Sequence, residues 1–202
     1  MDRDQTYTTS ESYISDLLTY HDLRFLHQPN AVNNGDGGRE LIVSKTMLRA
    51  TGHHYLLGAP KRPFVLGLTD LHQSNLFVDE DWNIKYLIGL KWVCSLPIEM
   101  RGALYCLWGH DLDDIIGANL EEYVIVRDEY MRIFEGKEEA LSPKLQYGLS
   151  LAQVTQSVWE KGWVWYCLSL TSVNGMCILF DQYVCRKYHP FPLTKEMDTV
   201  VS

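Results

Sequence analysis

The sequence has no basic patch and carries little positive charge. Its 202 residues include 18 Lys and Arg against 26 Asp and Glu, which gives a formal net charge of -8. Residues 111–139 alone contribute ten acidic and three basic side chains, which is nearly the whole imbalance. Because binding to a nucleic-acid backbone depends on clustered Lys and Arg, we expect no nucleic-acid partner.

Paired cysteines and an apolar leader are also missing. The five cysteines are odd in number, scattered and without a C-x-x-C spacing, which argues against a disulfide framework and against a zinc site. The first residues, Met1-Asp2-Arg3-Asp4-Gln5, are polar and acidic, so we expect neither a signal peptide nor a transit peptide. The predicted location is therefore the cytoplasm, with reduced thiols.

The only long uncharged run, the 19 residues 162–180, approaches the length of a membrane span. Its centre holds Ser169, Thr171, Ser172, Asn174 and Gly175. Polar residues are least favourable at the middle of a bilayer, so we expect a buried helix-turn-helix and no membrane partner.

Hydrophobic periodicity predicts an α+β chain that is mostly helical. We expect helices at 10–27, with Ser10 or Ser12 as the cap, and at 39–57. Short strands are expected at 63–68, 75–78 and 84–88, with a hairpin turn at 79–83.

A helical pattern resumes after the strands, with an acidic start at Asp111. We expect Gly136 to interrupt this helix, and Ser142-Pro143 to begin another helix that ends near Trp159. Residues 163–184 should then supply two short packed helices.

Asp70 and Asn75 are the residues whose spacing indicates a catalytic loop. An Asp followed five residues later by an Asn, between two strand-like runs, has the spacing of a phosphotransferase catalytic loop. In such a loop the Asp accepts or orients a hydroxyl proton, and the Asn oxygen binds a magnesium ion on the nucleotide phosphates. The spacing alone also fits two residues that merely cap and brace a tight loop.

The residues around this motif are similar to those of one protein family. The run Phe64-Val65-Leu66-Gly67-Leu68-Thr69-Asp70-Leu71-His72-Gln73-Ser74-Asn75-Leu76-Phe77-Val78-Asp79-Glu80-Asp81-Trp82-Asn83-Ile84 closely resembles the aminoglycoside phosphotransferase and choline-kinase-like family, and its fungal branch most of all. The segments 13–33, 92–97 and 180–182 are similar to that branch as well. The resemblance covers roughly residues 10–190.

The resemblance implies a protein-kinase-like fold with two lobes, of which this chain matches only the larger, mostly helical C-lobe. It implies that Asp70 is the catalytic base, that Asn75 is a magnesium ligand and that His72 supports the loop structurally. The implied cofactors are magnesium and ATP, and the implied substrate is a small molecule with a hydroxyl group.

On this basis we expect a tail at 1–9, one domain at 10–190 and a second tail at 191–202. The domain divides into a helical part at 10–60, a strand cluster with the catalytic-type loop at 63–90 and a second helical part at 111–185.

Three departures from the family pattern affect the site. Leu68-Thr69 replaces the usual His-Gly before the catalytic Asp. Gly89 stands where the family carries a metal-binding Asp, and Lys91 follows where an acidic residue is common. No Gly-rich strand pair or nucleotide-clamping Lys precedes Asp70. Because phosphoryl transfer depends on metals and cations, we expect that this chain alone is not a competent kinase.

Three functions remain open at this point. The first is a kinase whose N-lobe is supplied elsewhere. The second is a non-catalytic pseudokinase that binds a protein partner, and the third is a repurposed biosynthetic enzyme. In the third case Asp70 serves as a general acid or base for a cyclisation or isomerisation without ATP.

Other candidate residues have simpler explanations. Trp159, Trp163, Trp165 and Tyr166 are able to line a ligand cleft, but core packing is the preferred interpretation. Adjacent residues on a helix point in different directions, so we expect His53 and His54 to face apart rather than to form a metal pair.

Overall fold

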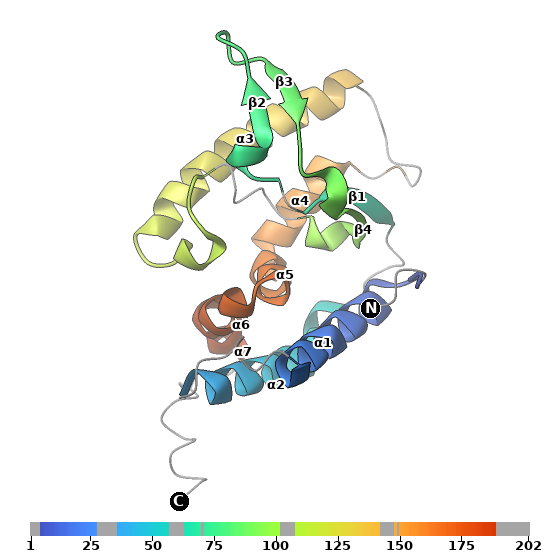
Figure 1. Ribbon diagram of the computed structural model, residues 1–202, viewed down its shortest axis with the longest axis vertical. Helices are drawn as coiled ribbons and strands as arrows, with labels where there is room; N and C mark the ends of the chain where they lie inside the picture. Colours follow the sequence, from blue (N-terminus) through green and yellow to red (C-terminus); the bar gives the residue numbers. More distant parts are fainter. Residues whose placement is uncertain are drawn as a thin grey trace, which may run out of the picture. The chain divides into compact units, whose positions relative to one another are not determined.

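The computed structural model describes residues 5–27, 36–56, 63–69, 71–101, 108–141, 148 and 150–188. This part of the chain is mostly helical and contains two small antiparallel sheets (Figure 1), which confirms the predicted α+β, mostly helical class. The chain forms two compact units. The first unit comprises Met1–Pro60 with Trp165–Ser202, and the second comprises Lys61–Val164.

The first unit is helical. Its elements are α1 (Ser10–His27), α2 (Asp36–Leu56), the greater part of α5 (Trp163–Thr171), α6 (Val173–Leu179), the π-helical η7 (Phe180–Cys185) and α7 (Arg186–Tyr188). The predicted bounds of α1 are confirmed, while α2 begins three residues before the predicted start.

The cap of α1 differs from the prediction. Thr9 Oγ1 accepts a hydrogen bond of 3.2 Å from Ser12 N, and Thr9 O accepts one of 3.3 Å from Tyr13 N. The prediction of Ser10 or Ser12 was wrong, because a hydroxyl one position earlier reaches the free N–H groups of the first turn. The segment before the helix also contacts it, since Tyr7 Oη donates to Asp16 over 3.1 Å.

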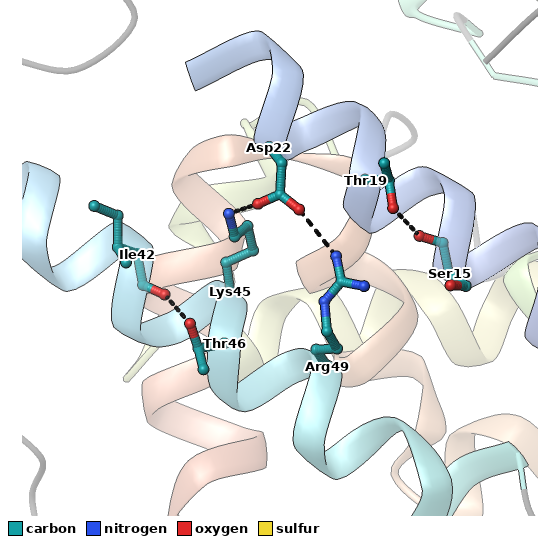
Figure 2. Close-up of polar contacts among 7 residues, drawn as sticks. All are labelled: Ser15, Thr19, Asp22, Ile42, Lys45, Thr46 and Arg49. Atoms are coloured by element: carbon teal, nitrogen blue, oxygen red, sulfur yellow. Dashed lines mark hydrogen bonds and ion pairs between the residues drawn. The ribbon is translucent and has the colours of Figure 1, made fainter. Parts of the chain in front are cut away.

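A bidentate carboxylate joins α1 to α2 (Figure 2). Asp22 on α1 forms ion pairs with Lys45 and with Arg49, the latter over 3.0 Å. Leu18 and Leu48 are buried in this unit. Partly exposed ion pairs contribute only about 0–1 kcal/mol, so the ion pairs set the register of the helices while apolar burial supplies most of the stability.

The uncharged run forms two short helices, as predicted. Ser172 ends α5 and caps α6, with its Oγ accepting a hydrogen bond of 3.2 Å from Gly175 N. Leu170, Met176 and Leu179 are fully buried. No helix in the described residues has both the length and the apolar character needed to cross a bilayer.

Two buried polar side chains reach backbone carbonyls across the first unit. Tyr166 Oη donates to Leu48 O over 3.2 Å, and His21 Nε2 donates to Leu170 O over 2.9 Å. Hydrogen bonds of this kind offset the cost of burying polar atoms between helices. They tie α5 to α1 and α2.

The second unit contains the four strands found in the described residues. These are β1 (Phe64–Leu68), β2 (Leu76–Val78), β3 (Ile84–Leu87) and β4 (Val93–Pro97). β1 pairs with β4 and β2 with β3, both antiparallel. The three predicted strands are confirmed, and β4 was not predicted. The predicted hairpin turn is also confirmed, with Asp79 N donating to Asn83 O over 3.0 Å.

The remaining elements of this unit are short 3₁₀ turns and two helices. They are η2 (Gln73–Asn75), η3 (Leu90–Trp92), η4 (Ile98–Met100), η6 (Leu112–Asp114), α3 (Asn119–Leu141) and α4 (Leu151–Glu160).

Two predictions about α3 were wrong. Asp111 caps the short turn η6, and the long helix begins only at Asn119. Gly136 lies within α3 and does not interrupt it. A glycine costs about 1 kcal/mol in a helix interior, which is too little to end this 23-residue helix. The predicted start at Ser142-Pro143 lies outside the described residues.

Glu138 on α3 caps the start of α4. Its carboxylate accepts hydrogen bonds from Ser150 Oγ, from Leu151 N over 2.6 Å and from Ala152 N over 3.1 Å. Partial burial opposes ionisation, but these hydrogen bonds and the charge of Arg101 together lower the pKa of Glu138 below its ordinary value. A carboxylate at a helix N-terminus satisfies free N–H groups and interacts favourably with the helix dipole.

We expect Glu138→Gln to lower the free energy of unfolding by about 1 kcal/mol, because one charged acceptor of the cap is lost. Since the folded-state pKa is lowered, the contribution is present above the unfolded-state value near 4.5 and is lost as the pH falls. Urea unfolding at several pH values measures both effects. Glu139→Gln, at an exposed neighbouring position, is the matched control and should leave stability unchanged.

The burial of His21 predicts a second effect of pH on the stability of the fold. Burial, with the nearby charges of Arg24 and Lys45, lowers the pKa of His21, although its bond to Leu170 opposes this. The folded chain therefore keeps His21 neutral, and stability decreases as the pH falls below about 6.5, where the unfolded chain takes up the proton. His21→Gln should flatten this loss in thermal melts, and His54→Gln on the exposed surface should not. Equal slopes for both variants would contradict the assignment.

Candidate functional site

The catalytic-type loop connects β1 to β2 in the second unit. Thr69 and the residues from Leu71 to Asn75 are described, whereas Asp70 lies outside the described residues. The loop ends in the 3₁₀ turn η2, which places Asn75 directly before β2. The position of Asn75 at a strand end is therefore set by a local turn.

His72 caps this turn. Its Nδ1 accepts a hydrogen bond of 3.4 Å from Ser74 N and lies 3.1 Å from Ser74 Oγ. His72 O accepts a 2.8 Å bond from Asn75 N. His72 thus holds the turn that presents Asn75.

The structure brings Asn75 and Gly89 together, although 14 residues separate them in the sequence. Ile88 N donates to Asn75 O over 3.0 Å, which extends the β2–β3 pairing by one residue. Gly89 follows with φ of 79°, and a Cβ built on it would lie 3.0 Å from Asn75 Nδ2. The two positions that the sequence relates to magnesium are therefore adjacent in space.

The described side chains at these two positions offer few ligands for a magnesium ion. Magnesium is bound by carboxylates, phosphates and water in octahedral geometry, and at these two positions the chain offers only the amide oxygen of Asn75. Gly89 has no side-chain oxygen, and the exposed Lys91 follows two residues later. Among the described residues, no group of three or more His, Cys, Asp or Glu is close enough to hold a metal.

The strand β4, which was not predicted from the sequence, begins beside the catalytic-type loop. Thr69 Oγ1 donates to the carbonyl of Trp92, the residue directly before this strand. Partial burial raises the pKa of the Cys94 thiol, although an interaction with the Thr69 side chain opposes this, so this thiol is not activated as a nucleophile. The short, mostly apolar run 92–96 before Pro97 was the available signal, but its brevity made it weak.

The aromatic candidates engage in separate contacts. The guanidinium carbon of Arg127 lies over the Trp159 ring, 4.4 Å from its centroid. In the first unit, Trp165 stacks on Tyr183 at 4.0 Å and Tyr166 stacks on Tyr55 at 4.5 Å. These rings pack in pairs within their own units, in agreement with the core interpretation.

The expected orientation of the two adjacent histidines was wrong. The rings of His53 and His54 lie 3.8 Å apart, and His54 also stacks on Tyr188 at 4.6 Å. Tyr188 is in α7, so a tertiary contact turns the His54 ring toward its neighbour.

We expect Gly89→Ala to lower the free energy of unfolding by about 1–2 kcal/mol, because a side chain at this φ is strained and its Cβ crowds Asn75. Gly136→Ala is the matched control. It lies in a helix with open space around it and should raise stability by about 0.5–1 kcal/mol. Urea unfolding of both variants measures the difference, and a neutral Gly89→Ala would contradict the close approach to Asn75.

No known family model, curated protein or solved structure matches this chain. The resemblance to the aminoglycoside phosphotransferase-like family therefore rests on the residues of the chain, above all on the run 64–84. The contact of Asn75 with Gly89 at the base of the β2–β3 hairpin is an observation that does not depend on this resemblance.

Proposed function

We propose that this chain is an aminoglycoside phosphotransferase-like domain, of the kinase C-lobe type, that has lost magnesium-dependent phosphoryl transfer. The observation that carries the proposal is the contact between Asn75 and Gly89. The sequence resemblance assigns a metal ligand to each position, and ligands of one ion must be neighbours. Their adjacency supports common descent from a metal site, and the glycine supports its loss.

The chemical consequence follows from the charges that remain. In a working phosphotransferase, the bound metal neutralises the negative charge that develops on the transferred phosphate. Replacement of a liganding carboxylate by glycine removes several kcal/mol of this stabilisation, about 10³-fold or more in rate. Lys91 adds a positive charge near the same position, and like charges repel a metal cation.

A second candidate function is supported by a different observation. Ten of the large exposed hydrophobic side chains among the described residues lie between Leu66 and Trp92. Exposed apolar surface in this amount is typical of a surface that meets another molecule. A non-catalytic interaction domain, located in the cytoplasm, is therefore compatible with the same fold, and it requires no small-molecule substrate.

Calorimetric titration with ATP and magnesium tests the loss of the metal site. We expect no magnesium-dependent binding by the natural chain and recovery of binding by Gly89→Asp. Asp is tolerated better than most residues at positive φ, and Gly89→Asn is the matched control with the same shape but no charge. Recovery in Gly89→Asn as well would show that carboxylate charge is not the missing element.

A phosphate-transfer assay tests the chemistry directly. The natural chain, incubated with magnesium-ATP and a panel of hydroxyl compounds, should show no turnover that depends on Asp70. Turnover that disappears in Asp70→Asn would overturn the proposal. An activity that needs Asp70 but neither ATP nor magnesium would instead identify a repurposed enzyme.

A further inference from the structure

A group of exposed apolar side chains, the strand surface, lies along the β2–β3 hairpin and the turn η3. We define it by Phe77, Trp82, Tyr86, Ile88, Leu90 and Trp92. The register of β2 and β3 pairs Phe77 with Tyr86, and Ile88 lies two residues beyond Tyr86. These three side chains therefore share one face of the hairpin.

The opposite face of the hairpin is more covered. Leu76 and Leu87 are paired there and are half-buried, so this face is less accessible at the base of the hairpin. A bulge between Phe77 and Val78 changes the pairing toward the turn, where Trp82 is exposed. At the other end, Leu90 and Trp92 follow Ile88 in the short turn η3. The residues of the strand surface thus follow one another along the chain from the hairpin to η3.

Its area reaches the scale of a dimer interface. Trp82, Tyr86, Trp92 and Phe77 are 82%, 70%, 56% and 49% exposed. At about 200 Å² per aromatic side chain, these four alone expose roughly 500 Å², and Ile88 and Leu90 raise the total to roughly 700 Å². Interfaces are about 60% apolar and bury about 800 Å² on each partner. The strand surface therefore provides enough apolar area for one side of such an interface.

The charges beside the strand surface favour a second copy of this chain as the occupant. Glu80 and Asp81 are exposed at the tip of the hairpin, and Lys91 is exposed beyond its base. Asp79 is already paired with Lys85 over 2.9 Å. One end of the surface is therefore acidic and the other basic. A two-fold axis that places two hairpins antiparallel brings each acidic tip to the lysine of the other copy.

We propose that this chain forms a symmetric homodimer through the strand surface, with the hairpins antiparallel. The dimer does not depend on any kinase-like activity, so it holds or fails independently of the proposed function. Apolar contacts of the aromatic side chains supply the affinity, and the two tip-to-base charge contacts set the orientation.

Sedimentation velocity over a micromolar to millimolar concentration series tests the proposal on the full chain. We expect a mass that rises from 23.4 kDa toward twice that value. Tyr86→Glu should weaken association at least about tenfold, because it places a charge at the centre of an apolar contact. Ile125→Glu, at an equally exposed position on α3, is the matched control and should leave association unchanged.

Charge exchange tests the antiparallel arrangement. Lys91→Glu alone, and Glu80→Lys with Asp81→Lys, should each weaken the dimer, and the three substitutions together should restore it. Circular dichroism confirms that each variant is folded. A chain that stays monomeric throughout, a Tyr86→Glu variant that associates normally, or a triple variant that fails to recover overturns the proposal.

Discussion

The hydrogen bond from Ile88 N to Asn75 O is the contact on which the site depends. It closes the base of the β2–β3 hairpin, so the loop before β2 and the segment after β3 meet at one place. Without it, Asn75 and Gly89 would be two residues in separate loops. Antiparallel pairing makes this meeting obligatory, because a hairpin always returns the end of its second strand to the start of its first.

Turn chemistry supports this pairing from both ends. At the tip, Asp79 accepts hydrogen bonds from Asn83 N over 2.8 Å and from Asp81 N over 3.1 Å. At the base, His72 caps the turn that ends at Asn75. Short polar side chains that bond to nearby N–H groups hold such turns without a large core. This explains how a hairpin that is exposed on much of its surface keeps a defined register.

Contacts between distant residues organise the helices in the same way. In the first unit, Asp22 orients α1 against α2 and His21 reaches a carbonyl of α5. In the second unit, Glu138 satisfies the start of α4, and the buried Arg127 on α3 donates to Gln156 over 2.7 Å while its guanidinium lies over Trp159. Each polar group provides its partner with an interaction in place of the water that burial removes. Because buried polar groups need such partners, the ways in which the helices of each unit can pack are limited.

Elements with local signals could be predicted from the sequence. The periodicity of α1, the Asp79–Asn83 turn and the polar interruption at Ser172 all act within a few residues, and the observed elements follow them. The pairing of β4 with β1 follows from contacts between segments far apart in the chain, and so does the cap that Glu138 provides for α4. These features depend on residues far apart in the chain, whose mutual burial and hydrogen bonding override weak local preferences.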